Sequence, residues 1–418
     1  MKIRKKNGIL VLLTVFILII AVISIRGTLG DRSPHHAVSP YNALEFAEAV
    51  PIHFSREENI SMVFVEHSDG TGDGAERLFR SMRNHGLDLH KTAASPLGLI
   101  ASEDVVLLKI NAQWDQRGGT NTDLVRGVIR EILNHPDGFS GEIVVADNGQ
   151  GHTAHAASGT RGSLDWPHSN AVDPSQSTLV VIRYFQAQGY RVTGIIWDDF
   201  TRTRVQEFDT GDMRNGFVVE DVVRPTGIMV SYPKFTTEFG THISFKKGIW
   251  DTNTRTYNSD ILKVINMPVL KSHWTFQVTA AVKNYMGVPS LALASARGSP
   301  HVSVGTGGMG TLMVATRMPA LNILDMIWVA PEGGPRSLAR TALQVNKIAA
   351  STDAFAMDHW ASREVLMPVA PARIRASMSP DGTEPGTFGH WMRLSMDELH
   401  RAGIWATMNE SEIVIIGP

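Results

Sequence analysis

The alternation of strand and helix patterns between Val105 and Asp147 constrains the fold more than any other feature of this chain. It opens with Val-Val-Leu-Leu-Lys-Ile, a near-continuous apolar run of the kind found in strands that are buried on both faces. Apolar residues then recur with helical spacing from Leu124 to Leu133, with Thr122 as the expected N-cap. A second apolar run ends at Asp147. This order predicts a parallel βαβ unit with a right-handed crossover.

The alternation continues toward the C-terminus. Further strands are predicted over residues 62–65, 190–197, 261–270, 322–330 and 412–416. Helices are predicted over residues 175–188, 276–285, 353–366 and 395–402, the last with a capping box formed by Ser395 and Glu398. Residues 200–258 are rich in Thr, Gly and Asp without a helical pattern and predict a β-rich insertion. We therefore expect an α/β fold, with a mostly parallel sheet and flanking helices, over residues 61–418.

A long apolar segment precedes this domain. The eighteen residues from Gly8 to Ile25 carry no charge and follow a basic cluster that begins at Lys2. A helix of this length is just long enough to cross a bilayer core of ~30 Å, and the basic cluster favours a cytoplasmic N-terminus. Because no small-residue cleavage site follows, residues 1–30 are predicted to be an uncleaved signal anchor. Residues 31–60 would then be a tether, and the single-pass protein would hold its main domain outside the cytoplasm, in the periplasm of a Gram-negative cell.

Charge and cysteine content exclude several classes of protein. Without the five basic residues of the N-terminal segment, 34 basic residues stand against 41 acidic ones, so the main domain lacks the basic excess of a nucleic-acid binder. The chain contains no Cys, which excludes disulfides, Cys-ligated zinc and Cys-held iron–sulfur clusters. An ordinary hydrophobic core must therefore stabilise the domain.

Lysines, a histidine and asparagines follow the predicted strands. Ligands bind beyond the carboxyl ends of the strands in an open parallel sheet, so these residues are candidates for a binding site. A buried ammonium group is costly unless it is paired with a carboxylate or binds an anion, although any single lysine could also extend to the surface. We predict that the following residues converge on one cleft: Lys109, Asn111, Lys271, His273, Lys283 and Asn284.

The loop that follows Asp147 is the best metal candidate. Asp147, His152 and His155 offer the oxygen and nitrogen ligands that zinc or a similar divalent ion accepts, and Asp165 and His168 follow. Their spacing matches no known signature, and a solvated Gly-rich loop is the favoured alternative. The sequence otherwise identifies no cofactor.

Three aspartates form a second set of candidates. Asp353 is expected to cap its helix, and Asp358 could face either the core or the site. Asp325 interrupts an apolar strand and needs a partner, for which a lysine is expected.

The segment from Gly305 to Gly310 does not match a nucleotide-binding motif. It lacks the Gly-Lys-Ser/Thr ending of a P-loop, so we expect a flexible loop or lid. The chain also lacks the G-x-S-x-G and H-E-x-x-H motifs of serine hydrolases and zincin proteases.

Six segments of the chain resemble one known family, the domain of unknown function 362. They are Val106–Asn111, Thr120–Thr122, Val264–His273, Ala281–Gly287, Ile323–Asp325 with Glu332–Pro335, and Ala350–Asp358. The resemblance covers roughly residues 105–366 and implies an α/β domain whose activity is unassigned. Some relatives carry ferredoxin-like cysteine clusters, a role that does not transfer to a chain without Cys.

Two functions remain open. The first is an enzyme that acts on an anionic small molecule or a surface polymer group, with Lys271, His273 and Lys283 as catalytic residues and a metal ion as a further option. Its ligand would be bound by Lys109, Asn111, Thr120, Asn284, Asp325 and Asp358. The alternative is a non-catalytic extracytoplasmic binding protein, for which some of the nine Trp residues could form an exposed platform.

Overall fold

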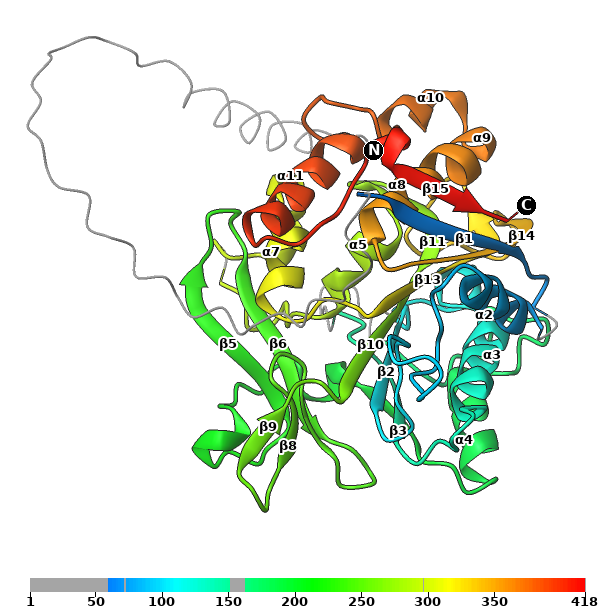
Figure 1. Cartoon of the computed structure of the whole chain (residues 1–418). Coiled ribbons are helices and arrows are strands. Elements are labelled where there is room, and N and C mark those ends of the chain that lie inside the picture. The colour runs from blue at the N-terminus through cyan, green and yellow to red at the C-terminus, as the bar shows by residue number, and fades with distance from the viewer. Residues whose placement is uncertain (1–58, 71–72, 151–161, 296, 418) are drawn as a thin grey trace, which may run out of the picture. The chain divides into compact units, whose positions relative to one another are not determined.

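The computed structural model describes residues 59–70, 73–150, 162–295 and 297–417 (Figure 1). The predicted α/β class is confirmed. The strands of the main sheet lie in the order β15 (Ile413–Ile416), β1 (Ser61–His67), β14 (Leu343–Ser351), β13 (Leu321–Ala330), β10 (Leu262–Met267), β2 (Val105–Ile110), β3 (Glu142–Asp147) and β4 (Val192–Ile196). The strands from β13 to β4 are parallel to their neighbours, whereas β14 runs antiparallel to both β1 and β13.

The predicted strand over residues 261–270 is divided in two. Pro268 follows β10 and precedes β11 (Val269–His273), and both strands pair in parallel with β13. β11 turns back into the antiparallel β12 (Gln277–Thr279), which leads into α5 (Ala281–Asn284). The first half of the helix predicted over residues 276–285 is therefore wrong, because residues 277–279 pair with β11 instead. This hairpin connects Lys271 to the short helix that carries Lys283.

Three helices cover one face of the main sheet: α2 (Gly74–Asn84), α3 (Thr122–Leu133) and α4 (Thr178–Gln186). Their apolar side chains share a buried cluster with alternate residues of β2, such as Leu108. The N-cap of α3 is Asn121, one residue before the expected Thr122, because the Asn121 side chain accepts hydrogen bonds from the backbone N–H groups of Asp123 and Leu124.

The opposite face packs against α5, α7 (Gly308–Ala315), α8 (Ala354–Ala361) and α11 (Phe388–Arg401). The other short helices are α6 (Pro300–Ser303), α9 (Met367–Val369) and α10 (Ala372–Arg375), and a π-helical turn over Ser362–Leu366 extends α8. Asp353 caps α8 as predicted, since its carboxylate accepts from the N–H groups of Phe355 and Ala356.

Two local predictions are wrong. The glycine-rich segment is helical over much of its length, because α7 begins at Gly308 and packs against α11. The capping box at Ser395 does not form, because Ser395 lies buried inside α11, well after the first residue of that helix. The sequence patterns also missed α2 and β14.

The predicted β-rich insertion is confirmed. It is a separate antiparallel sheet in chain order: β5 (Gly216–Val223), β6 (Met229–Thr236), β7 (His242–Ser244), β8 (Gly248–Asp251) and β9 (Thr256–Asn258), shown in green in Figure 1. Buried Glu207 connects three of its strands. The carboxylate accepts hydrogen bonds from the Tyr232 and Ser244 hydroxyls at 2.9 Å and from the Tyr257 hydroxyl at 2.8 Å.

The predicted membrane attachment requires correction. The apolar segment Gly8–Ile25 lies outside the described residues. Among the residues that are described, no helix combines the length and the apolar character needed to cross a bilayer. The single-pass anchor, and the extracytoplasmic location inferred from it, are therefore not upheld.

Candidate functional site

A buried ion pair lies at the carboxyl ends of β2 and β3. Lys109 Nζ is 2.8 Å from Asp147 Oδ1, and both side chains are almost completely excluded from solvent. Asp147 Oδ2 also accepts the Ala112 N–H at 2.7 Å. Burial lowers the pKa of Lys109 and raises the pKa of Asp147, while their mutual contact opposes both shifts. Gly287 covers the pair closely, because a Cβ there would lie 2.4 Å from Asp147 Oδ1.

A chain of buried asparagine amides crosses the strand ends beside this pair. Asn111 on the β2 side donates to the Asn284 oxygen at 2.8 Å, and Asn284 donates to the Asn266 oxygen at 2.8 Å. Asn266 in β10 donates to the Asn322 oxygen at 2.9 Å, and Asn322 donates to the Ser351 carbonyl at 3.2 Å. The chain therefore connects α5 to three neighbouring strands of the main sheet.

Thr120 holds the loop between β2 and α3 in place. Its hydroxyl accepts the Asn111 N–H at 2.8 Å and donates to the Met267 carbonyl at 2.6 Å. Both atoms of the hydroxyl are thus used within the protein, so its contacts explain how Asn111 is oriented.

Lys271 and Lys283 are buried lysines of a different kind from Lys109. Lys271 Nζ donates to the Gly118 carbonyl at 2.5 Å and makes no ion pair with a described carboxylate. Burial and the charge of Lys283 lower the pKa of Lys271 to about 7, and the charges of Asp147 and Asp325 oppose this shift.

The Lys283 ammonium has even fewer polar contacts. Within the described residues it makes no hydrogen bond or ion pair, although the side chain is only 6% exposed. Its Nζ lies 5.2 Å from the centroid of the Phe276 ring, which is a cation–π contact. Burial lowers its pKa to about 7. An amine in this position could be neutral or charged near pH 7.

His273 lies at the end of β11, close enough to both lysines for their charges to act on it. Its Nδ1 accepts the backbone N–H groups of Thr275 and Phe276 at 3.1 and 3.2 Å. The proton of the neutral ring is therefore assigned to Nε2. Burial, followed by the charges of Lys283 and Lys271, holds the pKa of His273 far below its usual range. The imidazole is thus a neutral hydrogen-bond donor.

The two candidate aspartates bind backbone amides. Asp325 Oδ2 accepts the Asn121 N–H at 2.8 Å and the Asn170 side-chain amide at 3.1 Å, whereas a lysine partner was expected. Asp358 accepts the Ala281 and Val282 N–H groups at 2.8 and 2.9 Å and so fixes the start of α5. Burial raises the pKa of each aspartate to about 7.

The metal-binding residues predicted from the sequence lie only partly within the described residues. His152 and His155 of the predicted metal loop lie outside the described residues, and the carboxylate of Asp147 contacts Lys109 and Ala112. His168 and Asp165 are described, and Asp165 accepts the Ser177 hydroxyl at 2.7 Å. Within the described ranges, the group whose ligand atoms lie close enough to hold an ion is a different one: His359, Asp381 and Glu410.

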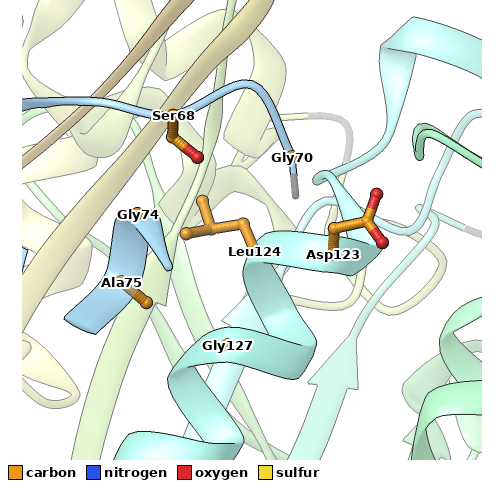
Figure 2. A pocket seen from close by; sticks show the side chains of 7 residues that line it. All are labelled: Ser68, Gly70, Gly74, Ala75, Asp123, Leu124 and Gly127. Carbon is orange, nitrogen blue, oxygen red and sulfur yellow. The ribbon is translucent and has the colours of Figure 1, made fainter. Parts of the chain in front are cut away.

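A small pocket lies elsewhere, between the starts of α2 and α3 (Figure 2). Its lining residues are Ser68, Gly70, Gly74, Ala75, Asp123, Leu124 and Gly127. The empty volume is about 180 Å³, less than the ~300–1,000 Å³ typical of ligand sites. Asp123 is the charged residue of this lining, and its carboxylate would repel an anion, so this pocket is a poor candidate for an anion site.

The structure thus brings together most of the residues selected from the sequence. Asn111 contacts Asn284, the charge of Lys283 acts on Lys271, and the charges of both lysines act on His273. Sequence reasoning missed Asn266 and Asn322, although each interrupts an apolar strand, the signal that identified Asp325. It also missed His359, Asp381 and Glu410, which no local motif connects.

Comparison with known proteins identifies one family. Residues 249–363 match the family described as Domain of unknown function (DUF362), which confirms the predicted resemblance over that range. No curated protein and no solved structure matches the chain.

Proposed function

We propose that this protein is an enzyme that binds an anionic small molecule at Lys271, Lys283 and His273 and catalyses proton transfer on it. One observation carries the proposal: Lys271 and Lys283 are both buried, the charge of Lys283 lowers the pKa of Lys271, and neither lysine forms an ion pair with a described carboxylate. A structural pair such as Lys109 with Asp147 leaves no such excess of positive charge.

An anionic ligand would lower the energetic cost of burying two charged lysines. Burying one unpaired ammonium is costly, and a second ammonium nearby adds repulsion, so the apo site favours the neutral amines. A carboxylate, phosphate or sulfate would pair with one charged amine and raise the pKa of that amine, while the other amine keeps the low pKa that burial gives it. The Nε2–H of neutral His273 could donate a further hydrogen bond to the same anion.

The proposed chemistry follows from the pKa values. General acid–base catalysis is most effective when the pKa of the catalytic group is near the working pH. Lys271 and Lys283 both have a pKa of about 7, so one amine could hold the anion while the other accepts or returns a proton. Lysines that are desolvated in this way are a recurrent feature of enzyme active sites.

A non-catalytic binding protein is the second candidate. Trp274, the residue after His273, is 78% exposed, and an aromatic side chain beside an anion site suits capture of a ligand that also has an apolar part. The binder would use the same lysines without turnover.

A thermal-shift screen of carboxylates, phosphates and sulfates would test the anion site. A ligand at one hundred times its dissociation constant adds ~2.7 kcal/mol of stability. We expect the shift to persist in Lys246→Met, which removes a partly exposed lysine paired with Glu220, and to disappear in Lys271→Met and Lys283→Met. An undiminished shift in the last two variants would overturn the proposal. Deuterium incorporation from D₂O into the ligand that binds would distinguish enzyme from binder.

A further inference from the structure

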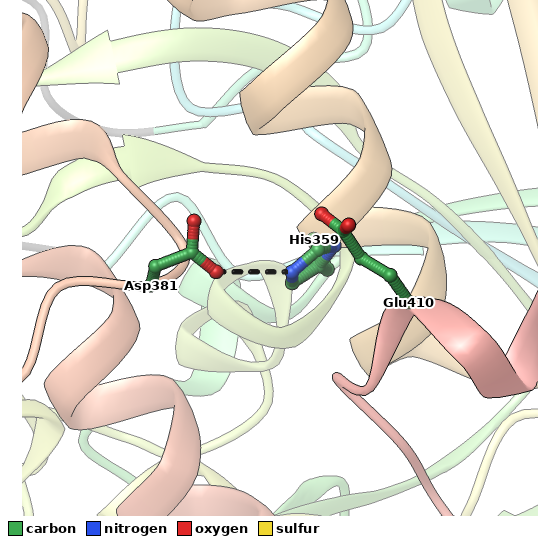
Figure 3. Close-up of side chains that lie close together, drawn as sticks. All are labelled: His359, Asp381 and Glu410. Carbon is green, nitrogen blue, oxygen red and sulfur yellow. Dashed lines mark ion pairs between the residues drawn. The ribbon is translucent and has the colours of Figure 1, made fainter.

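Three potential metal ligands from separate segments meet beside α8 (Figure 3). His359 belongs to α8, Asp381 lies between the 3₁₀ turn Ala376–Met378 and α11, and Glu410 opens the 3₁₀ turn before β15. One ligand atom from each residue lies within 4.8 Å of the others. Figure 3 shows the imidazole between the two carboxylates, with its ring edge directed toward Asp381.

The His359 nitrogen is the observation that points to a ligand. His359 is only 2% exposed, and its Nε2 has no hydrogen-bond partner within the described chain. The carboxylate oxygen that pairs with it, Asp381 Oδ1, is 3.7 Å away, beyond hydrogen-bond distance. Buried polar atoms nearly always have a partner, so an orphaned nitrogen that faces the Asp381 carboxylate requires an explanation.

We propose that His359, Asp381 and Glu410 bind one divalent transition-metal ion of the Zn²⁺ or Mn²⁺ class. An imidazole nitrogen with two carboxylate oxygens suits these ions better than Ca²⁺, which prefers oxygen ligands alone. Three protein ligands leave at least one coordination position for water. The inference is independent of the proposed function at Lys271 and Lys283.

The geometry requires only a small adjustment. Ligand atoms at ~2.0–2.2 Å from a tetrahedral zinc ion lie roughly 3.3–3.6 Å apart. The Asp381 and Glu410 side chains are 59% and 60% exposed, so they can move inward while the buried imidazole stays in place. Burial lowers the pKa of His359 and so keeps the imidazole in the neutral form that binds metals.

Arg363 is the competing cation at this site. It forms ion pairs with Asp381, at 3.4 Å, and with Glu410. Arg363 does not explain the buried His359 Nε2, because this nitrogen has no hydrogen-bond partner within the described residues while Arg363 is in place. Arg363 is 37% exposed, so its side chain could turn outward when an ion enters. The metal would thereby join α8 to the two C-terminal turns.

Metal titration of the tag-free, chelator-stripped full chain tests the site. Zn²⁺ and Mn²⁺ are added separately, and bound metal is measured by calorimetry and by elemental analysis after gel filtration. We expect one saturable equivalent per chain, with affinity at least tenfold weaker in His359→Gln and in Asp381→Asn. Glu332→Gln is the matched control, because it removes a similarly exposed carboxylate that pairs with Arg373 elsewhere, and it should bind as the unmodified chain does.

Arg363→Met separates a metal site from an ion-pair network. If the three residues bind metal, removing the competing guanidinium should strengthen binding severalfold, and metal should restore any loss of melting temperature. Because Asp381 is exposed, Asp381→Asn keeps the test valid even if His359→Gln fails to fold. Unsaturable binding, an equivalent that survives in Asp381→Asn, or an Arg363→Met variant that metal does not restabilise would each overturn the proposal.

Discussion

Lys109 Nζ lies 2.8 Å from Asp147 Oδ1, which joins the carboxyl ends of two neighbouring parallel strands through an ion pair closed to solvent. Removing one partner of a buried pair leaves the other as an uncompensated charge, which typically costs ~3–5 kcal/mol. We therefore expect Lys109→Met to lower the free energy of unfolding by about that amount in urea denaturation. Lys247→Met, which removes a lysine 2.6 Å from Asp209 in a pair whose two side chains are exposed, should cost less than about 1 kcal/mol.

Lys283→Met should behave in the opposite way. The Lys283 amine has no ion-pair partner among the described residues, so its removal strands no carboxylate, and Met keeps the apolar stem against Phe276. We expect the free energy of unfolding at pH 7 to stay constant or to rise. A loss as large as that of Lys109→Met would show that Lys283 is half of a structural pair and would contradict the anion site.

The contrast between these two lysines marks what sequence reasoning could and could not predict. The apolar run of β2 and the helical spacing of α3 predicted the parallel sheet, because a strand buried on both faces is continuously apolar whereas an amphipathic helix is apolar every three to four residues. Ligands bind beyond the carboxyl ends of parallel strands, and this rule placed Asn111 near Asn284. In the structure, Asn111 Nδ2 lies 2.8 Å from Asn284 Oδ1. The strand pattern did not reveal that Asp147 contacts Lys109, since the register between β2 and β3 has no signature in either segment.

Errors in the helix predictions have similar physical causes. Residues 277–279 have no strong strand pattern, and they are extended because β11 offers them a free edge. Ser395 and Glu398 match a capping box, yet α11 begins earlier, at Phe388, because Phe388 and Trp391 pack into the core. Tertiary burial therefore outweighed the local signal in both segments.

The pH dependence of stability provides a third prediction. Lys271 and Lys283 have a pKa of about 7 when folded against 10.5 normally, so the unfolded chain binds more protons between about pH 7 and 10.5. Asp325 and Asp358 have a pKa of about 7 against 3.8, so the folded chain binds more protons between about pH 4 and 7. These four groups together predict that the free energy of unfolding falls toward pH 7 and rises above it.

Urea denaturation at pH 5, 7 and 9 would measure this effect. Lys283→Met should flatten part of the rise above pH 7, and Asp358→Asn should flatten part of the fall below it. Profiles that remain parallel to that of the unmodified protein would contradict the assigned shifts.

The asparagine chain supports a fourth prediction. Asn266→Ala would leave the Asn284 amide and the Asn322 oxygen without their partners, and each stranded buried group costs ~1–3 kcal/mol. We expect a loss of a few kcal/mol, whereas Asn134→Ala, at an exposed helix end, should change stability by less than about 0.5 kcal/mol. A neutral Asn266→Ala would mean that water replaces the lost contacts.

Asp358 supports the last prediction, as a positioning residue for Lys283. Its carboxylate accepts the N–H groups of Ala281 and Val282, the two residues that directly precede Lys283 on α5. In Asp358→Asn one acceptor becomes a donor that faces an N–H group, so we expect α5 to loosen and water to reach Lys283. The pKa of the amine should then rise from about 7 toward its ordinary value, measured as the pH at which acetic anhydride labels Lys283 at half its maximal rate.

Asp353→Asn is the matched control for this effect. Asp353 is a buried aspartate that accepts three backbone N–H groups, those of Phe355, Ala356 and Thr407, but it caps α8 and makes no hydrogen bond to the residues of α5. Both variants should lower the melting temperature, because each loses a hydrogen bond from a buried N–H group. Only Asp358→Asn should move the labelling pH of Lys283. An equal shift in both variants would mean that general loosening of the fold, rather than the contact between Asp358 and α5, sets the pKa of that amine.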